Sequence, residues 1–456
     1  MPSSSAKRQA QDLVLPYGKH PRIELGQQST VDAEYRNDEA STSANKADQI
    51  CRGCQKIDFE AIFSEDRRDP RLYKIWGNRR FILSHMNRQS NCTLCQFFYS
   101  TREPPLDETV VDPVYCLRVF PAKGELGAWE LDFDDSPAFI VVPILDNYPF
   151  RFQDTHGIIM ELSETPENFC GRQIQPQVDL SVIKGWLEIC DNNHKALCKQ
   201  KPNPQVPKGF RVIDCVTRKI VPWENVANPK QYVTLSYVWG SFKGKFVTRG
   251  GAIPSPLPGT IEDTILLTTN LGYRYLWIDR YCITQDDAMD MHIQIQSMDE
   301  IYQQSVVTVV AAAGDDPRYG LPGIGATPRE RQPCVKVGNK TLVYTPYVRK
   351  EILNSNWNSR GWTYQEGLLA RRKLVFTATQ VYFQCNAMHC LESIRAPLKN
   401  LHTYKNVRMR DMVDISRVFP LRGLGKSPND LDKRLNEYLQ RSLRYERDML
   451  NAFRVF

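Results

Sequence analysis

The sequence predicts an α/β protein whose core is a parallel β-sheet flanked by helices. Two observations lead to this fold class. Apolar segments of strand length recur at 232–236, 275–279 and 306–313, and the segments between them repeat apolar residues at helical intervals. Strands that alternate with helices at this spacing favour parallel pairing through right-handed crossovers. A chain of 456 residues has room for roughly two to three domains, so we expect this sheet to form one of them.

The segments before this core are predicted to form a tail and a mixed α+β region. Residues 1–47 contain little apolar surface with which to offset the entropic cost of ordering, so a disordered N-terminal tail is predicted. Within residues 48–200, alternation of apolar and polar residues over 110–165 favours antiparallel strands. Asp179 then precedes a predicted helix with an apolar stripe and is expected to cap it.

Composition and local motifs predict the remaining boundaries. The proline-rich segment 201–207 is expected to link the cysteine-containing mixed region to a core domain at 208–395. Thr260 to Asp263 has the form of a capping box and predicts the start of the first helix of that domain. The last segment, 396–456, is highly charged and is predicted to be mostly helical.

Four cysteines of the mixed region have the spacing of a metal site. They stand in two C-x-x-C pairs, Cys51 with Cys54 and Cys92 with Cys95. Each pair offers two thiolates in a tight bite, and two pairs complete the tetrahedron that structural zinc prefers. We therefore predict a structural zinc ion, with buried free thiols and a redox pair as the alternatives.

A second set of ligand-type residues lies on the predicted helix after Asp179. Cys190, His194 and Cys198 recur every four residues, which would place them along one helix face. A helix can present two such ligands to a metal, as the H-E-x-x-H arrangement does. A half-buried helix face with one hydrogen-bonded histidine explains the same pattern and is the favoured interpretation.

Composition and charge exclude several classes of function. The net charge of +7 is spread over the chain without a basic, aromatic-interleaved stripe, so nucleic-acid binding is not predicted. The N-terminus lacks the apolar stretch of a secretory signal, and the longest apolar run, 306–313, is too short for a membrane span. An odd number of cysteines, 13, favours a reduced, cytoplasmic protein over a disulfide scaffold.

Four sequence blocks of the predicted core domain stand in a recognisable order. They are Leu235-Ser-Tyr-Val-Trp-Gly240, Leu276-Trp-Ile-Asp279 with Cys282-Ile-Thr-Gln-Asp286, the segment Met298 to Tyr302, and Arg360-Gly-Trp-Thr-Tyr-Gln-Glu366. Together they resemble the fungal heterokaryon incompatibility (HET) domain family over about residues 211–390. The resemblance implies a role in non-self recognition and regulated cell death.

The same resemblance implies a fold and an activity. HET domains are thought to be distant relatives of TIR domains, which have a flavodoxin-like parallel sheet. Some TIR domains cleave NAD+ at the nicotinamide–ribose bond, and one of their helices carries Trp followed four residues later by a catalytic Glu. Trp362 and Glu366 have that spacing. The resemblance therefore implies a TIR-like sheet, NAD+ as substrate, and Glu366 as the catalytic residue of an NAD+ nucleosidase.

This chemistry needs one carboxylate and a binding surface. Nicotinamide leaves as a neutral molecule without a general acid, so the carboxylate serves to stabilise oxocarbenium character at the ribose. Aromatic rings can stack on the base or nicotinamide, and arginines can pair with the pyrophosphate. The substrate-binding residues expected on this basis are Ser236, Tyr237, Trp239, Gly240, Asp279, Arg280, Gln285, Arg360 and Trp362.

Several of these residues also have a structural interpretation. A carboxylate early in a helix interacts favourably with the helix dipole, which would explain Glu366 without catalysis. Trp239 and Trp277 are large apolar side chains that commonly fill a core, and Asp279 could cap a turn. Glu300 is a rival carboxylate, but its neighbours suggest a helix surface.

Two classes of function remain open. The first is an NAD+ glycohydrolase that kills or arrests the cell, works as a homo-oligomer, and is restrained by the N-terminal region. The second is a non-enzymatic module that self-associates or recruits an incompatibility partner protein. Release of nicotinamide from NAD+ by concentrated protein would distinguish the first from the second.

Overall fold

The computed structural model describes most of the chain between residues 50 and 443. The described residues are 50–64, 71, 80–83, 86, 89–105, 113–121, 136–144, 155–164, 169–198, 206–240, 251–399, 417–420, 427–443 and 449. The chain divides into two compact units, residues 1–47 and 48–456. The first unit, predicted as a disordered tail, lies outside the described residues, as do 201–205 of the predicted linker and more than half of 396–456.

One sheet of the second unit has six strands in the order β1-β2-β3-β4-β12-β11, and every neighbouring pair is antiparallel. The strands are β1 (Arg80–Ile82), β2 (Tyr115–Pro121), β3 (Pro137–Pro143), β4 (Gly157–Glu161), β11 (Cys334–Val337) and β12 (Lys340–Pro346). Leu117 and Val119 belong to one apolar cluster, whereas Cys116 and Phe120 belong to another. Both faces of this sheet are therefore covered.

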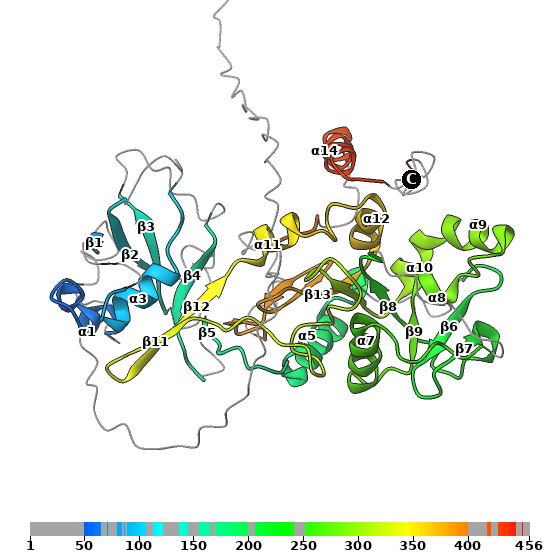
Figure 1. Ribbon diagram of the computed structural model, residues 1–456, viewed down its shortest axis with the longest axis horizontal. Coiled ribbons are helices and arrows are strands. Elements are labelled where there is room, and N and C mark those ends of the chain that lie inside the picture. Colours follow the sequence, from blue (N-terminus) through cyan, green and yellow to red (C-terminus); the bar gives the residue numbers. More distant parts are fainter. Residues whose placement is uncertain are drawn as a thin grey trace, which may run out of the picture. The chain divides into compact units, whose positions relative to one another are not determined.

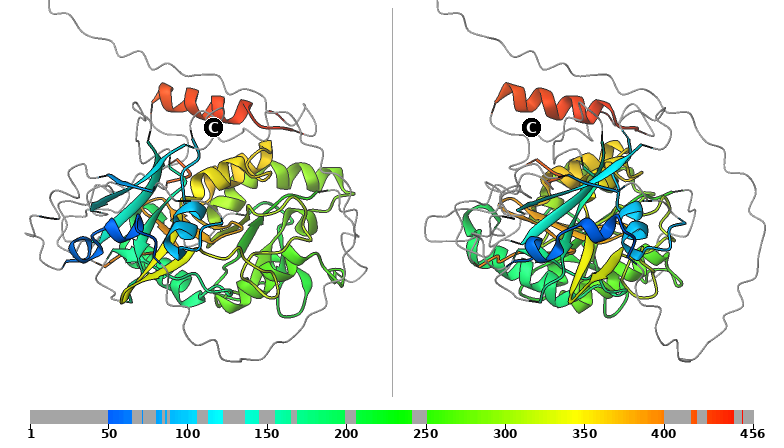
Figure 2. Two further views of the ribbon diagram at one scale, coloured as in Figure 1. Left: turned by 60° about the vertical axis from the view of Figure 1, so that its left-hand side comes forward. Right: turned by 90° about the vertical axis from the view of Figure 1, so that its left-hand side faces the viewer.

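Strands from distant parts of the sequence complete this sheet. β12 pairs with β4 from Leu342 opposite Glu161 to Pro346 opposite Gly157. Figure 2 shows the yellow hairpin of β11 and β12 together with the blue and cyan N-terminal elements. Leu342 and Val343 are fully buried. A segment inserted between β10 and α12 thus contributes to the core built by the N-terminal strands.

The second sheet has eight strands in the order β15-β14-β13-β10-β8-β9-β6-β7. The central strands β13, β10, β8 and β9 pair in parallel, whereas the outer strands pair antiparallel. Its strands are β6 (Arg211–Asp214), β7 (Lys219–Pro222), β8 (Val233–Ser236), β9 (Tyr275–Trp277), β10 (Thr308–Ala311), β13 (Arg372–Phe376), β14 (Val381–Cys385) and β15 (His389–Leu391). A short ladder of β5 (Cys170–Gly171) and β16 (Ile394–Arg395) forms a third sheet.

The predicted fold class, a TIR-like, flavodoxin-like parallel sheet flanked by helices, was wrong. The larger sheet is mixed, because four of its seven strand pairs are antiparallel, and the smaller six-stranded sheet is wholly antiparallel. The strands with helices between them lie in the parallel centre. The edges are hairpins, such as β6 and β7 joined by residues 215–218, and a two- to five-residue turn permits only antiparallel neighbours.

Helices cover both faces of the larger sheet. Figure 1 shows α5 and α7 on one side of this sheet and α10 and α12 on the other. The step from β8 to β9 and the step from β9 to β10 run in opposite directions across the sheet. Because both crossovers are right-handed, their helices must lie on opposite faces of the sheet. The described helices are α1 (Phe59–Ile62), α3 (Thr93–Ser100), α5 (Leu180–Asn193), α6 (Lys195–Cys198), α7 (Gly259–Asn270), α8 (Asp279–Cys282), α9 (Ala288–Gln296), α10 (Met298–Gln304), α11 (Val348–Asn354), α12 (Gly361–Leu369) and α14 (Pro428–Leu439).

Two predicted helix starts had different outcomes. The Asp179 cap is confirmed, since its Oδ1 accepts a hydrogen bond of 2.9 Å from the backbone N–H of Ser181 in α5. The capping box at Thr260 to Asp263 was wrong, because α7 begins one residue earlier and has no side-chain cap. The Asp263 carboxylate instead accepts a hydrogen bond of 2.8 Å from the backbone N–H of Leu321. It thereby fixes the loop after β10.

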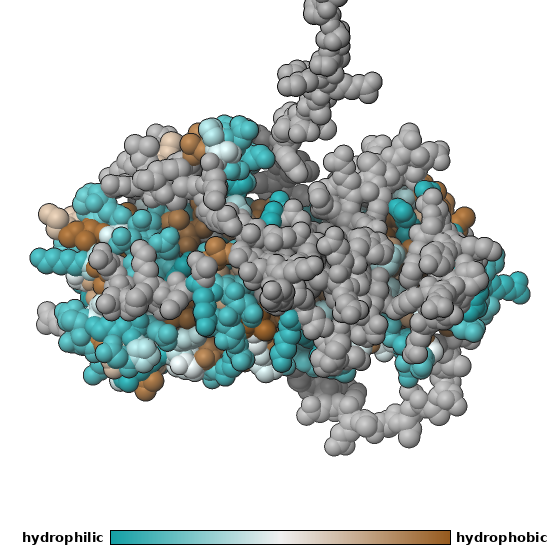
Figure 3. Space-filling model, turned by 180° about the vertical axis from the view of Figure 1, so that it is seen from behind, coloured by the Kyte–Doolittle hydropathy of each residue, from teal (hydrophilic) through white to brown (hydrophobic). Residues whose placement is uncertain are grey.

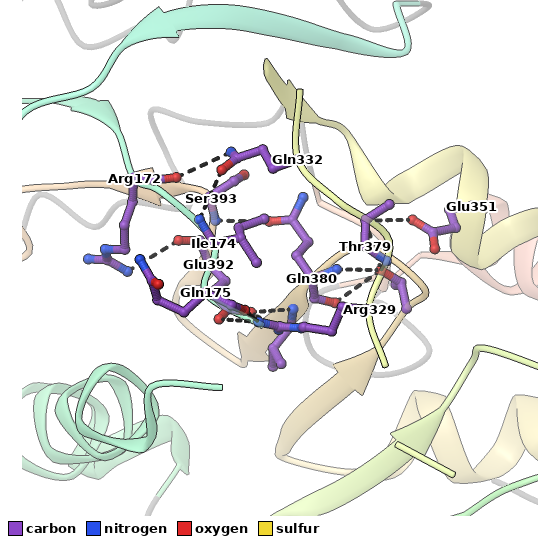
Figure 4. Close-up of polar contacts among 12 residues, drawn as sticks. Arg172, Ile174, Gln175, Arg329, Gln332, Glu351, Thr379, Gln380, Glu392 and Ser393 are labelled. Atoms are coloured by element: carbon purple, nitrogen blue, oxygen red, sulfur yellow. Dashed lines mark hydrogen bonds and ion pairs between the residues drawn. The ribbon is translucent and has the colours of Figure 1, made fainter. Parts of the chain in front are cut away.

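A buried polar network joins segments that are far apart in the sequence (Figure 4). Arg329 and Glu392 form an ion pair whose side chains are only 2% and 6% exposed. Arg329 also donates to the carbonyl of Gln175 at 2.9 Å, and Glu392 accepts from the backbone N–H of Val381 at 2.8 Å. The network ties the segment before α5 and the loop before β11 to the β14–β15 hairpin, so we assign it to the fold.

The described surface is mainly hydrophilic on the face seen in Figure 3, where hydrophobic residues are scattered. Scattered apolar residues are normal on globular proteins and indicate no particular binding partner. None of the described helices combines the length and the apolar composition that crossing a membrane requires.

Candidate functional site

The central residues of the predicted site come from the carboxyl ends of two parallel strands and from one helix. Ser236 ends β8, Asp279 follows β9 and begins α8, and Glu366 lies on α12. Carboxyl ends of neighbouring parallel strands meet at one edge of a sheet, which is where α/β proteins commonly bind ligands. In Figure 1, β8 and β9 lie side by side, and α12 covers the sheet next to them.

Glu366 is buried and hydrogen-bonded. Its side chain is 4% exposed, and its carboxylate accepts a hydrogen bond from the Ser236 hydroxyl. Trp357 Nε1 donates to the same hydroxyl oxygen at 2.7 Å, so that the Ser236 proton is directed toward Glu366. The Tyr302 hydroxyl donates to the backbone carbonyl of Leu235 at 3.3 Å and also interacts electrostatically with the carboxyl. Glu366 is therefore held in position by Ser236 of β8, which Trp357 in turn orients.

The surroundings of Glu366 bring its titration close to neutral pH. Burial raises the pKa of the Glu366 carboxyl to about 7, and the negative charge of Asp279 adds to this rise. The Ser236 hydrogen bond and the positive charge of Arg360 act in the opposite direction. Carboxyls with such a pKa are enriched at functional sites, although buried structural networks also contain them.

Asp279 is the second carboxyl of the site. It accepts hydrogen bonds from Trp239 Nε1 at 3.0 and 3.1 Å and from the backbone N–H of Arg280 at 2.6 Å. Burial raises the pKa of Asp279 to about 6, and the Arg280 N–H, the Arg360 charge and the Trp239 bond oppose the rise. The Arg280 guanidinium lies 5.2 Å from the centre of the Trp239 ring. Asp279 thus holds both the indole and the backbone of the α8 turn.

Three other predicted residues surround these carboxyls. Arg360 precedes α12 and donates to the backbone carbonyl of Tyr237 at 3.3 Å. Gln285 donates to the backbone carbonyl of Asp279 at 3.1 Å. The Tyr237 side chain is buried, and its hydroxyl has no hydrogen-bond partner among the described residues. Arg360 and Gln285 therefore stabilise the backbone at the ends of β8 and β9 through hydrogen bonds.

Two predicted residues lie at the margin of the site. Gly240 has a φ of +58°, which favours glycine, and an added Cβ would lie 3.0 Å from Asp316 Oδ2. Trp362, one turn before Glu366, is partly exposed and packs against the apolar cluster of α12 and α14. Within the described part of the chain, no hydrogen bond joins Trp362 to either carboxyl.

Sequence reasoning missed two residues that contact the site, Trp357 and Tyr302. Tyr302 ends one of the four recognised blocks, and Trp357 lies three residues before another. A buried indole N–H or phenol O–H needs a hydrogen-bond partner, and this need was the available sequence signal.

Two residues weighed as alternatives lie in the core and on the surface. Trp277 is fully buried and packs edge-on against Tyr302, with ring centres 5.6 Å apart, so it belongs to the core. Glu300 is exposed on α10.

The four cysteines predicted as metal ligands lie close together. The Sγ atoms of Cys51, Cys54, Cys92 and Cys95 are all within 4.8 Å of one another. The Cys95 Sγ lies 3.6 Å from that of Cys51 and 3.6 Å from that of Cys54. These separations are too long for a disulfide and near the ~3.8 Å between sulfurs of a tetrahedron with Zn–S bonds of ~2.3 Å. The donor set and its geometry thus fit a metal ion.

An open depression of about 570 Å³ lies between α3 and β11. Its lining includes Gln96, Phe97, Arg331 and Lys336, but neither Glu366 nor Asp279 and no carboxylate at all. The depression therefore adds nothing to the chemistry at the strand ends.

Comparison with known proteins assigns the region that holds the two carboxyls. The family described as heterokaryon incompatibility protein (HET) matches residues 232–366, from the residue before β8 to Glu366. Heterokaryon incompatibility protein 6, OR allele, of Neurospora crassa is 33% identical over 107 residues, which cover 20% of this chain and 16% of that protein. No solved structure gives a significant match. Residues 232–366 therefore match the heterokaryon incompatibility (HET) family, and the resemblance to HET-domain proteins predicted from the sequence is confirmed over this region.

Proposed function

We propose that this protein acts in heterokaryon incompatibility as an enzyme that hydrolyses NAD+ to nicotinamide and ADP-ribose. The observation that carries the enzymatic part is Glu366, a carboxyl with a pKa of about 7 that interacts with the second carboxyl, Asp279. The HET domain and the similarity to the Neurospora protein support the role in incompatibility. That similarity spans 16% of the relative's length, so the activity and partners of the whole protein are proposed.

The proposed reaction takes place at C1′ of the nicotinamide ribose. The bond from C1′ to the nicotinamide nitrogen breaks, and its electron pair leaves with neutral nicotinamide. Water adds its oxygen to C1′ and releases one proton. The Glu366 carboxylate stabilises the positive charge that develops on the ribose in the transition state.

The neighbouring residues have proposed roles in binding. Arg280 and Arg360 pair with the pyrophosphate, because guanidinium groups bind phosphate oxygens through two parallel hydrogen bonds. Trp239, fixed by Asp279, stacks on a base or nicotinamide ring. Ser236 is a positioning residue that keeps Glu366 in place.

Access to Glu366 is part of the proposal. A side chain that is 4% exposed cannot contact a ribose, so the resting chain is inactive until the segments around α12 move. In this proposal, self-association of the protein causes the movement. An incompatibility partner protein or the N-terminal region controls the self-association. A resting inactive state would protect the cell that makes the protein.

The burial of Glu366 also favours a second candidate, a non-enzymatic signalling module. The hydrogen bond from Ser236 and the nearby Tyr302 hydroxyl stabilise the carboxyl, as they would in a purely structural network. In that case the HET domain would self-associate or recruit a partner without chemistry.

The two candidates differ in one assay on concentrated, full-length protein incubated with NAD+. We expect the parent to release nicotinamide, and Glu366→Gln, which keeps an oxygen acceptor for Ser236, to lose about 100-fold or more of this activity. Glu300→Gln, on the exposed face of α10, serves as the matched control and should keep it. If the parent released no nicotinamide at any protein concentration, the enzymatic function would be ruled out. Equal activity of Glu366→Gln would reject the site assignment alone.

We further propose that the four N-terminal cysteines bind a structural zinc ion. This ion would join Cys51 and Cys54, at the start of the described chain, to Cys92 and Cys95 at the N-terminus of α3. We also propose a cytoplasmic location, because none of the 13 cysteines forms a disulfide, as expected of a reducing compartment.

A further inference from the structure

A second cluster of metal-ligand side chains lies outside the matched HET residues. The Sγ atoms of Cys190, Cys198 and Cys385 and a ring nitrogen of His194 all lie within 4.8 Å of one another. His194 Nδ1 is 3.5 Å from Cys385 Sγ. All four side chains are buried, with at most 3% exposure. Three thiols and one imidazole are one of the standard ligand sets of tetrahedral zinc.

Two separate parts of the fold build this cluster. Cys190 lies in the last turn of α5, His194 caps that helix, and Cys198 ends α6. The favoured sequence interpretation, one half-buried helix face, was wrong, because the helix breaks at His194 and all three residues are buried. The break turns Cys198 back toward Cys190. Cys385, at the end of β14, supplies the fourth side chain from the edge of the larger sheet.

Two buried cations lie beside the cluster, and a negative charge on the cluster would stabilise them. Lys373 is 1% exposed; its ammonium donates to the Ala370 carbonyl at 2.6 Å and lies 5.2 Å from the centre of the Phe419 ring. It also interacts electrostatically with Cys385 and Cys198, and no carboxylate forms an ion pair with it in the described part of the chain. Arg372 is also buried and interacts with Cys190 as well as with Asp191. A buried cation without a counter-charge is strongly unfavourable. One Zn²⁺ with three thiolates and a neutral imidazole has a net charge of −1, which would offset Lys373.

Backbone donors also surround one of the sulfurs. The N–H groups of Ala387 and Met388 lie 3.4 and 3.3 Å from Cys385 Sγ. Donors directed at sulfur stabilise its thiolate form, which is the form that binds metals. A neutral buried thiol has little need of two such donors.

We propose that Cys190, His194, Cys198 and Cys385 bind one zinc ion, which ties α5 and α6 to the edge of the larger sheet. This ion is independent of the N-terminal cysteines and of the NAD+ chemistry. It crosslinks residues almost 200 positions apart in the sequence, next to the strand that precedes the hairpin of β14 and β15. Its role is structural, because four protein ligands leave no open position on the metal.

Metal analysis of the full-length protein tests the proposal. We expect Cys198→Ser/Cys385→Ser to contain one zinc equivalent less per chain than the parent. Cys215→Ser removes a buried cysteine outside both clusters, and its zinc content should equal that of the parent. An unchanged zinc content in Cys198→Ser/Cys385→Ser would overturn the proposal.

A second measurement leaves the cluster intact, since loss of a buried ligand can unfold the chain. In Cys51→Ser/Cys54→Ser, only the second cluster can bind a metal tetrahedrally. Replacement of zinc by Co²⁺ should then give the visible bands of tetrahedral cobalt together with sulfur-to-cobalt charge-transfer bands. A folded variant that lacks these bands would overturn the proposal. So would a disulfide among Cys190, Cys198 and Cys385, detected by mass spectrometry in protein purified without oxidant.

Discussion

At the scale of single residues, the protonation state of Glu366 affects stability and, in the proposed reaction, activity. Its folded pKa of about 7 lies above the ordinary value of 4.5, because burial and Asp279 disfavour the charged form. The folded chain therefore holds a proton that the unfolded chain loses between about pH 4.5 and 7. Over this window the contribution of Glu366 to the free energy of unfolding falls as the pH rises, and above pH 7 it stays constant.

The catalytic proposal predicts the opposite trend for the rate. Only the carboxylate can stabilise a cationic ribose, so NAD+ hydrolysis should increase as the pH rises through about 7 and then level off. Single-turnover rates between pH 5.5 and 8.5 would measure this, with denaturant unfolding at each pH as the companion experiment. A rate that is highest at pH 5.5 would contradict the proposed role of the carboxylate.

Ser236 offers a sharper test, because its hydroxyl lowers the pKa of Glu366. Ser236→Ala removes that hydrogen bond, so the midpoint of the pH–rate profile should move above 7. The variant should also lose about 1–3 kcal/mol of stability, since the buried Trp357 Nε1 then lacks its acceptor. Ser305→Ala is a matched control, a buried serine bonded to Thr234 and Thr308. If the midpoint of the pH–rate profile did not move in Ser236→Ala, the hydrogen bond between Ser236 and Glu366 would not control the pKa seen in that profile.

The residue identities of the site could be predicted, but their environment could not. Ser236 and Asp279 stand at the ends of apolar runs, and Glu366 lies in a recognised block, so each could be singled out. The burial of Glu366 depends on Trp357 and Tyr302, whose contacts cross from other elements. For the same reason Cys385 could not be joined to Cys190, since nothing local to β14 indicates its partner.

At the scale of elements, strand pairing shows where sequence patterns stop being informative. A buried strand followed by a helix predicts a parallel neighbour, and β8, β9 and β10 have such neighbours. The outer strands β6, β7, β14 and β15 pair antiparallel, and the short turns of the β6–β7 and β14–β15 hairpins account for this pairing within each hairpin. Periodicity reports which face of a strand is buried, but not which strand lies beside it.

Helix α5 allows a prediction at this scale, because it contains a glycine. Gly185 is partly exposed, and no described atom lies within 4 Å of an added Cβ. Gly185→Ala should therefore stabilise the protein by about 0.5–1 kcal/mol in denaturant unfolding, since alanine loses less backbone freedom in a helix. Gly320→Ala is the contrasting variant: its φ is +93° and the new Cβ would lie 2.0 Å from Thr327 Oγ1, so it should destabilise. A loss of stability in Gly185→Ala would contradict the expectation.

At the scale of the whole molecule, the two large sheets are interdependent. The segment between β10 and α12 leaves the larger sheet, contributes β11 and β12 to the smaller one, and then returns. The Arg329–Glu392 pair fixes the beginning of this excursion against the β14–β15 hairpin. The HET domain and the N-terminal strands consequently share a core, although they are distant in sequence.

This arrangement predicts that residues 208–399 alone will not behave as a folded domain. Without β4, the edge of β12 loses its hydrogen-bonded partner, and the fully buried Leu342 and Val343 lose their cover. The fragment 208–399 should aggregate, whereas 48–399 should elute from a size-exclusion column as a folded species. A soluble 208–399 fragment with the circular dichroism expected of a mixed α/β domain would contradict this. Deletion of the N-terminal region therefore disrupts the core as well as any restraint, so restraint is better tested by substitutions on its exposed surface.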